Sequence, residues 1–147
     1  MTDQVITPYV LYQDVAGALE WLSRAFGFRE TLRFTEDDGR ITHAEMEVGG
    51  STVMLGQPAG DFRNPAELGV ATVLLHIAVD DVDAQFRRAV SAGAGVVRKP
   101  ADQSYGDRNC AVTDPEGHQW WFGQTLRDVA PEEWGATAPR SSDSEPS

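Results

Sequence analysis

Cysteine is almost absent from this chain, and long apolar runs are missing. Cys110 is the single cysteine in 147 residues, which excludes an internal disulfide framework and is typical of proteins in a reducing compartment such as the cytoplasm. No segment approaches the roughly 20 apolar residues of a membrane-spanning helix. The first residues, MTDQVITP, have neither the basic nor the apolar region of a secretory signal. We therefore expect a cytoplasmic protein that makes no membrane contact.

Positive charge is also scarce. Twelve Lys and Arg residues face 23 Asp and Glu residues, and the formal net charge is −11. Nucleic acids and anionic membrane surfaces bind basic protein surfaces, so neither is expected as a partner. A cationic ligand is compatible with this charge. Part of the negative charge lies in the last residues, so the folded body is less acidic than the total indicates.

The most informative stretch is YGDRNCAVTDPEGHQWWFGQ, from Tyr105 to Gln124. Its pattern predicts two short strands, Asn109–Thr113 and His118–Gly123, joined by the tight turn Asp-Pro-Glu-Gly. Side chains alternate between the two faces of a strand. In the second strand this puts Gln119, Trp121 and Gly123 on one face and His118, Trp120 and Phe122 on the other. With large aromatic residues on both faces, one face is expected to pack on a core and the other to line a cavity.

This stretch has a counterpart earlier in the chain. Subtracting 67 places Gly106 on Gly39, Gly117 on Gly50, and Phe122-Gly123-Gln124 on Leu55-Gly56-Gln57. The same offset places Asp81 on Asp14, at two expected helix starts, without a gap. The chain therefore reads as an internal duplication, and two copies favour a closed pair of modules over a solenoid, which needs three or more repeats.

Hydrophobic periodicity and turn residues give both modules the order β-α-β-β-β, an α+β fold with pseudo-symmetric halves. We expect one domain over residues 5–125, made of module one (5–57), a linker (58–70) and module two (71–125). Residues 126–147 are expected to form an acidic, largely disordered tail, with Pro139–Ser147 the most disordered. Whether Trp134 in that tail docks on the body stays open. The predicted elements are strand Ile6–Gln13, helix Val15–Phe26, strands Phe28–Thr35, Ile41–Val48 and Ser51–Gly56, then strand Thr72–Val79, helix Val82–Ala92 and strand Gly95–Lys99 before the closing pair.

The motifs DVAGALEWLSRAFGF, VDDVDAQFRRAVSAGA, YGDR and DPEGHQWWF resemble the vicinal oxygen chelate superfamily. This group contains glyoxalase I, extradiol dioxygenases and bleomycin-type antibiotic-binding resistance proteins. The resemblance covers about Val5 to Gln124. It implies paired modules that curl into U-shaped sheet clefts, usually in a homodimer, and a small-molecule ligand. The fold alone does not decide among the several chemistries of the family.

Metal-using members of the family place ligands on the first and last strand of each module. In this sequence the resemblance puts those positions at Thr7, Met54, Leu74 and Trp121. None of the four is His, Glu or Gln, and a divalent ion needs several such donors. His76 lies two positions later than a first-strand ligand and has Tyr9 as its duplicate. We therefore expect no metal and no other cofactor.

Strand alternation assigns a set of residues to the cleft. Cys110 and Val112 are placed there with Thr7, Leu11, Glu47, Leu74, Ala78 and Gln119. The loop residues Tyr105 and Arg108 are expected at the mouth, although an Asp–Arg pair that fixes the loop explains Arg108 equally well. The expected ligand-binding residues are Tyr9, His43, Glu45, Met54, His76, Tyr105, Arg108 and Trp121.

Three functions are compatible with this set. The first is a metal-free binder that sequesters a small aromatic or cationic molecule, as antibiotic-binding members of the family do; the retained aromatics and the acidic charge favour it. The second is an enzyme without the usual metal, of the lyase or isomerase kind, that acts on a small carbonyl or aromatic substrate with His43 or His76 as general acid/base and Glu45 orienting the imidazole. The third is a glyoxalase-type metal enzyme or dioxygenase, with His43, Glu45 and His76 as ligands. Structural explanations compete for each residue: a dimer contact for Trp121, a satisfied core histidine for His76, and a solvated strand face for His43 and Glu45.

Overall fold

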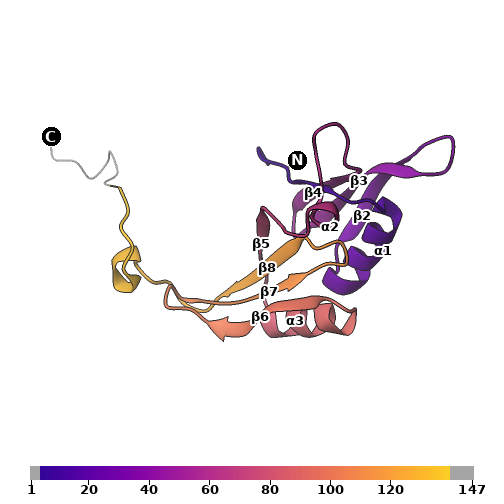
Figure 1. Cartoon of the computed structure of the whole chain (residues 1–147). Coiled ribbons are helices and arrows are strands. Elements are labelled where there is room, and N and C mark those ends of the chain that lie inside the picture. The colour runs from indigo at the N-terminus through magenta and orange to yellow at the C-terminus, as the bar shows by residue number, and fades with distance from the viewer. Residues whose placement is uncertain (1–3, 140–147) are drawn as a thin grey trace.

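A computed structural model describes residues 4–139 of the chain. The part of the tail from residue 140 onward, where disorder is predicted, lies outside the described residues. Figure 1 shows two modules, each a four-stranded sheet with one long helix. The elements are β1 Tyr9–Leu11, α1 Val15–Phe26, β2 Arg29–Thr35, β3 Ile41–Val48, β4 Ser51–Gly56, α2 Pro65–Leu68, β5 Leu74–Ala78, α3 Val82–Ser91, β6 Gly95–Asp102, β7 Asp107–Thr113, β8 Gln119–Thr125 and the 3₁₀ turn η1 Pro131–Trp134.

Both long helices begin where the sequence places a capping aspartate. The side chain of Asp14 accepts a hydrogen bond from the Gly17 N–H, and that of Asp81 accepts one from the Ala84 N–H, which satisfies one of the unpaired donors of each first turn. Helix α1 ends at Gly27, whose φ of 79° is the left-handed conformation that glycine adopts without strain. The predicted helix starts are confirmed.

The two sheets repeat one topology, β1-β4-β3-β2 and β5-β8-β7-β6. In each sheet the first strand pairs in parallel with the last, and the other neighbours are antiparallel. The register repeats as well, since Tyr9 is opposite Met54 and His76 is opposite Trp121, 67 positions later in both strands. The expected α+β fold of two β-α-β-β-β modules is confirmed.

One strand breaks the 67-residue repeat. Glu45 is opposite Met54, but Trp121 is opposite Ala111, which is the counterpart of position 44 at the offset of 67. Strand β3 carries a bulge where its register with β2 shifts between Phe34 and Thr35. The turn from β7 to β8 is one residue longer, because five residues separate Thr113 from Gln119 and four separate the structurally equivalent pair, Glu47 and Thr52. The two irregularities cancel in the sequence, so an ungapped alignment conceals that β7 is one residue out of phase.

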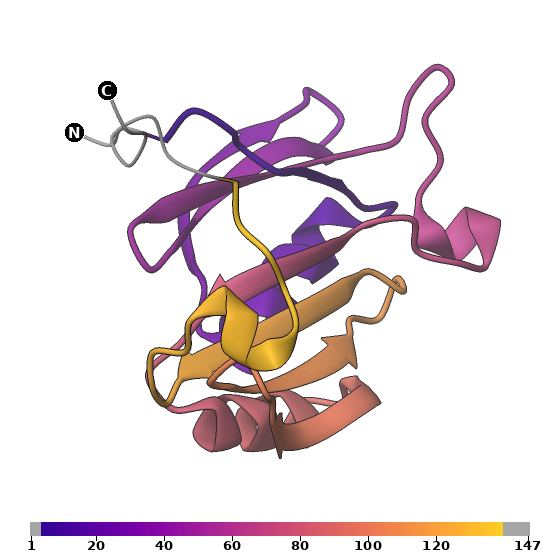
Figure 2. The ribbon, with the colours of Figure 1, turned by 90° about the vertical axis from the view of Figure 1, so that its left-hand side faces the viewer.

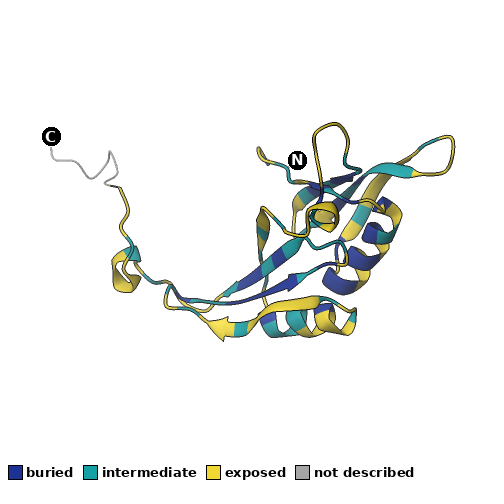
Figure 3. Cartoon of the chain, in the orientation of Figure 1, coloured by how far each residue is buried: buried dark blue, intermediate teal, exposed yellow. Residues whose placement is uncertain are grey.

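The core lies on one side of both sheets. Ala44, Met46, Val53 and Leu55 pack under α1, and Cys110, Val112, Trp120 and Phe122 form the corresponding layer of sheet two. Phe26, at the end of α1, meets Trp120 and Phe122 edge to face, with ring centroids 5.6 and 5.0 Å apart. Figure 3 shows this buried layer against the exposed outer strands β2 and β6. In the part of the chain that the structure describes, neither long helix covers the opposite face of a sheet, and we call this the open face; Figure 2 shows the two sheets one above the other.

The Asp-Pro-Glu-Gly-His turn joins the modules. The carboxylate of Asp114 accepts hydrogen bonds from the Tyr12 hydroxyl at 2.6 Å and from Trp120 Nε1 at 2.9 Å. The carboxylate of Glu116 accepts bonds from the backbone N–H groups of Gln13 and Asp14 at the start of α1. His118 Nε2 donates to the Leu11 carbonyl at 2.7 Å. The motif therefore attaches module two to the end of β1, which explains its residues without a ligand.

The linker and the tail hold local structure that the sequence analysis left out. The linker contains α2, which begins with a capping box between Asn64 and Glu67 and has Pro65 at its first position. In the tail, η1 brings the Trp134 ring to 5.5 Å from the Tyr105 ring, at the tip of the β6–β7 hairpin. Trp134 thus docks, although it stays 43% exposed. Among residues 4–139, no helix has the length and apolarity that crossing a bilayer requires.

Candidate functional site

The open face of sheet one carries a hydrogen-bonded row of three polar side chains. The Tyr9 hydroxyl lies 2.7 Å from His43 Nδ1, and His43 Nε2 lies 3.1 Å from Glu45 Oε2. A carboxylate only accepts, so Nε2 carries the proton that is donated to Glu45. Nδ1 of the neutral ring then accepts a hydrogen bond from the Tyr9 hydroxyl. Three residues expected in the cleft are therefore brought together.

This row is built by strand pairing. Tyr9 and Glu45 both lie opposite Met54, from β1 and β3, and His43 lies opposite Gly56. Gly56 leaves room for the Tyr9 ring, since a Cβ atom there would stand 2.6 Å from a ring carbon. Leu32 and Phe34 on β2 lie opposite Glu45 and His43 and continue the face outward. Tyr9, Leu32 and Phe34 are 52%, 45% and 55% exposed, so the face is both aromatic and accessible.

The equivalent row on sheet two has different chemistry. Arg98, Ala111, Trp121 and His76 follow one another across β6, β7, β8 and β5. The Arg98 guanidinium carbon lies 4.9 Å from the centroid of the Trp121 ring, a cation–π distance. Trp121 Nε1 donates to Gln119 Oε1 at 3.2 Å. The rings of His76 and Tyr9 stand at duplicate positions, each over a glycine of the last strand.

Two expected cleft-mouth residues have structural partners. Arg108 donates to both carboxylate oxygens of Asp83 on α3 at 3.0 Å and to Asp102 at 3.0 Å. Its guanidinium therefore lies on the helix side of sheet two, away from the open face, and these hydrogen bonds hold the pKa of Asp83 below its usual range. The Tyr105 hydroxyl accepts from Asn109 Nδ2 at 2.6 Å, so Tyr105 stands at the hairpin tip beside Trp134.

The assignment of Cys110 and Val112 to the cleft is wrong. Both are fully buried in the core layer, and Cys110 lies opposite Phe122. The one-residue phase shift of β7 is the physical reason, because it exchanges the two faces of the strand. Burial raises the pKa of the Cys110 thiol to about 11, so the thiol stays protonated and unreactive at neutral pH.

The four family metal positions do not supply a metal site. Met54 and Trp121 lie in the middle of the two open faces, where the resemblance places them, but a thioether and an indole are not ligands for a hard divalent ion. Thr7 and Leu74 add no carboxylate or imidazole. Within residues 4–139, no three His, Cys, Asp or Glu side chains converge, so His43, Glu45 and His76 are not brought together in one chain.

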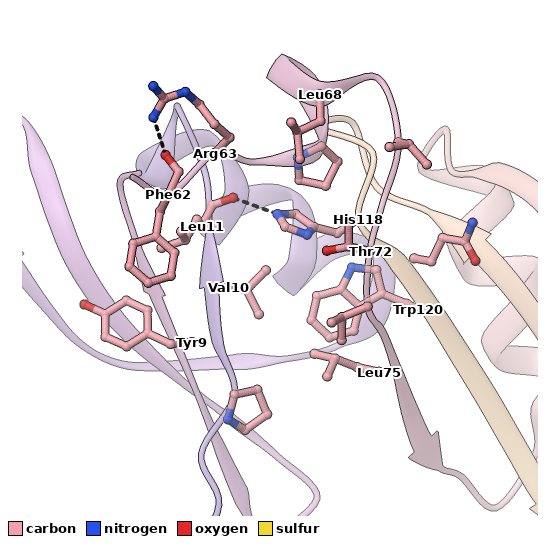
Figure 4. Close-up of a pocket in the computed structure, with 15 residues that line it drawn as sticks. Tyr9, Val10, Leu11, Phe62, Arg63, Leu68, Thr72, Leu75, His118 and Trp120 are labelled. Carbon is pink, nitrogen blue, oxygen red and sulfur yellow. Dashed lines mark hydrogen bonds between the residues drawn. The ribbon is translucent and has the colours of Figure 1, made fainter. Parts of the chain in front are cut away.

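Two pockets flank the junction between the modules. The first, of about 320 Å³, lies among β1, the linker and β5, and Figure 4 shows Tyr9, Phe62, Leu68 and His118 around it. The second, of about 490 Å³, is lined by His76 with residues of both modules. Each reaches the lower range of small-ligand cavities. Tyr9 lies on the open face of sheet one and also lines the first pocket. His76 lies on the open face of sheet two and also lines the second pocket.

Sequence reasoning missed Arg98, Leu32 and Phe34. They lie on the outer strands β2 and β6, whose alternation could be read only once their pairing with β3 and β7 was known. Register shifts in both pairings hid it. The available signal was a positive residue inside a short apolar strand, Gly95–Lys99, of an otherwise acidic chain.

Comparisons with known proteins agree with this fold. A model of the Glyoxalase/Bleomycin resistance protein/Dioxygenase superfamily matches residues 5–122. The uncharacterized protein Rv0887c of Mycobacterium tuberculosis is 39% identical over 132 residues, covering 86% of this chain and 78% of its own. The crystal structure of TioX from Micromonospora sp. ML1 is 32% identical, with a TM-score of 0.68 over 86% of this chain and all of TioX. That of TnmS3, an antibiotic binding protein from Streptomyces sp. CB03234, is 21% identical, with a TM-score of 0.65 over 84% of this chain and 97% of TnmS3.

Proposed function

Because this chain belongs to the glyoxalase/bleomycin resistance protein/dioxygenase superfamily, we propose that it binds a small aromatic or cationic molecule, of the antibiotic-like kind, on its open faces. Binding uses no metal ion, and the molecule is sequestered rather than converted. The observation that carries the proposal is the exposed aromatic surface of sheet one, where Tyr9 and Phe34 both neighbour His43, whose ring is hydrogen-bonded to the carboxylate of Glu45. Aromatic faces and a nearby carboxylate attract a planar cation.

The residues at the metal positions support the same reading. Met54 and Trp121 occupy the centres of the two faces with groups that pack against a ligand and do not coordinate an ion. The fold is also compatible with a binding role, since TnmS3 shares it and is an antibiotic binding protein. At 21% identity this supports the proposal only at the level of the fold.

We propose that the protein works as a homodimer that encloses the ligand. On the open faces of one chain, Tyr9, Phe34 and Leu74 remain about half exposed. Monomers rarely leave such apolar surface uncovered. A second copy placed over these faces would remove this surface from water and would turn each face into a closed cleft. Light scattering after size-exclusion chromatography tests this, with a mass of one chain as the contradicting result.

Calorimetric titration of the purified protein tests the binding function. N-methylquinolinium is a suitable planar cation, and its neutral analogue 2-methylnaphthalene tests the contribution of charge. We expect saturable binding that is weakened about tenfold or more by Phe34→Ala, the usual loss for a central aromatic contact. Trp134→Ala, which removes an aromatic from the tail, is the matched control and should leave the affinity unchanged. The proposal is contradicted if none of the planar compounds binds.

A second function is favoured by the Tyr9–His43–Glu45 row. This order of groups makes Tyr9 a candidate proton acceptor, with His43 taking the phenolic proton and Glu45 stabilising the resulting imidazolium. The resulting phenolate then removes a proton from the carbon next to a carbonyl group, which leaves an enolate, and a proton returns to the same carbon, so that this carbon is racemised or exchanges its hydrogen. Deuterium incorporation into small ketones and aldehydes, followed by NMR in D₂O, tests it. Exchange that is lost in Tyr9→Phe and in His43→Gln would favour the enzyme over the binder.

A further inference from the structure

Arg98 lies across the open face of sheet two. It belongs to β6, and the ring it covers belongs to β8, so one strand lies between them. Neighbouring strands are about 4.8 Å apart, so roughly twice that distance separates the two backbones, and the side chains of Arg98 and Trp121 together span it. The residue on the intervening strand is Ala111, whose methyl group leaves the path free and is completely covered. Arg98 is thus part of the face rather than of its rim.

Arg98 differs from several other arginines in how its charge is balanced by the residues that the structure describes. Arg29, Arg33, Arg40, Arg63 and Arg108 each form an ion pair with a carboxylate. Within residues 4–139, Arg98 makes no ion pair. Its one polar contact there is a long bond from Nη1 to Asn109 Oδ1 at 3.4 Å. In a chain of net charge −11, an arginine on an open face with unused N–H donors is suited to an anion from outside the chain.

The groups around Arg98 are already held in place. Gln119 fixes the indole of Trp121 through Nε1. Asn109 is buried and is itself anchored to the Tyr105 hydroxyl. Beyond Trp121 in the same row, His76 adds an accessible imidazole that lies over Gly123. A ligand therefore meets a planar cation, an indole and an imidazole without reorganising them, which lowers the entropic cost of binding.

We propose that the Arg98–Trp121–His76 row binds the planar aromatic end of a ligand that carries a carboxylate. The aromatic ring packs against the indole, and the carboxylate accepts hydrogen bonds from the guanidinium. A guanidinium presents paired donors that match the two oxygens of a carboxylate. The matching row on sheet one is Leu32, Glu45, Met54 and Tyr9, and the carboxylate of Glu45 gives it the opposite electrostatic character. The inference rests on the proposed binding function and assigns to sheet two the acidic end of the ligand.

Calorimetric titration of the full-length protein with 2-naphthoate and 2-naphthamide tests the inference. The two probes share ring and shape and differ in charge. We expect 2-naphthoate to bind about tenfold or more tightly than 2-naphthamide, the scale of one charge-assisted contact. Arg98→Gln should remove this preference, so that the two probes bind with similar affinities, because a neutral amide no longer favours the carboxylate. Arg98→Lys should retain part of it, because the charge stays but the paired donors are lost. Trp121→Leu should weaken both probes.

The outcomes separate this inference from the broader function. Equal affinity for the two probes in the wild type, or a preference for 2-naphthoate that survives Arg98→Gln, overturns the anionic subsite while planar binding stands. Failure of both naphthalene probes, with N-methylquinolinium still bound, also overturns it. Failure of every planar compound overturns the binding function as well. Circular dichroism and thermal unfolding confirm that each variant is folded.

Discussion

The imidazole of His76 lies over Gly123, so closely that a Cβ atom at position 123 would stand 2.7 Å from it. Tyr9 and Gly56 repeat this relationship in module one, with a separation of 2.6 Å. Neither glycine has a positive φ, so space for a ring, rather than backbone conformation, requires glycine at both positions. Both modules thus keep a glycine that leaves space for a polar ring on the open face, although the ring is tyrosine in module one and histidine in module two.

Replacing Gly56 with alanine should move Tyr9 away from His43 without unfolding the protein. The added methyl group displaces the flexible end of the ring, and the more favourable strand propensity of alanine offsets part of the cost, so stability should change by less than about 1 kcal/mol. Nitrogen-15 NMR of the histidine rings should show that His43 Nδ1 has lost its hydrogen bond. The control is Gly123→Ala, which should alter the His76 signals alone. Unchanged His43 signals in Gly56→Ala would contradict the observed row.

Asp114 should be a main determinant of stability because it joins the modules. It is 5% exposed and is the acceptor for the buried Tyr12 hydroxyl and the Trp120 indole. Asp114→Ala leaves both donors unpaired and should lower the free energy of unfolding by about 2–4 kcal/mol. Asp38→Ala, which removes an exposed pair with Arg40, should change the free energy of unfolding far less, because solvent screens that pair. Urea denaturation measures both, and equal effects would show that the turn is not the joint between modules.

Stability should fall at alkaline pH. Burial raises the pKa of Cys110 to about 11, and burial together with Asp114 raises the pKa of Tyr12 well above its ordinary value. Above pH 9 the unfolded chain loses the thiol proton while the folded chain retains it, so the unfolded state binds fewer protons and stability decreases with pH. The Cys110 contribution is present below about pH 9 and is lost by about pH 11. Between pH 7 and 11, the unfolding temperature should fall less steeply for Cys110→Ala than for the wild type.

The sequence predicted most of the fold because its signals there are local. Asp14, Gly27 and Asp81 mark helix ends through their own hydrogen bonds and dihedral angles. The Asp-Pro-Glu-Gly turn is equally local. No local signal shows which side chains of β7 face the core. Inferring this from the duplicate strand β3 fails, because β3 has a bulge and the turn after β7 has one extra residue. Those two changes cancel in the alignment, and Cys110 was assigned to the wrong face for that reason.

The site was predictable where a strand alternates clearly. Ile41–Val48 has one uniformly small or apolar face, so His43 and Glu45 were placed correctly on the other. Arg98 was not predictable, because its position on the open face depends on pairing across three strands and on the small size of Ala111. The partner of Arg108 also depends on the fold, as Asp83 lies 25 residues away on α3.

Arg98 and Arg108 provide a matched pair, because the same substitution acts on opposite faces of sheet two. Arg108→Gln should leave the affinity for 2-naphthoate within about twofold, since the side chain is bound to Asp83 and Asp102. It should lower stability only slightly, because solvent screens an exposed ion pair. Arg98→Gln should lower the affinity for 2-naphthoate and leave stability nearly unchanged. Because Asp83 has a lowered pKa, the stability lost in Arg108→Gln should shrink as the pH falls through the carboxylate range. Loss of 2-naphthoate binding in Arg108→Gln would contradict this assignment and would indicate that Arg108 contacts the ligand.

Metal addition should neither load nor stabilise the protein. Thr7, Met54, Leu74 and Trp121 stand where the family resemblance places ligands, and within residues 4–139 no three His, Cys, Asp or Glu side chains converge. Elemental mass spectrometry before and after incubation with Zn²⁺, Ni²⁺, Mn²⁺ and Fe²⁺ should give less than one ion per chain, and the unfolding temperature should not rise, as it would for a ligand that binds the folded state. A dimer could still bring His43 and Glu45 of one chain to His76 of another. Stoichiometric metal that disappears in both His43→Gln and His76→Gln would reveal such a shared site and would turn the proposal from a binder to a metal enzyme.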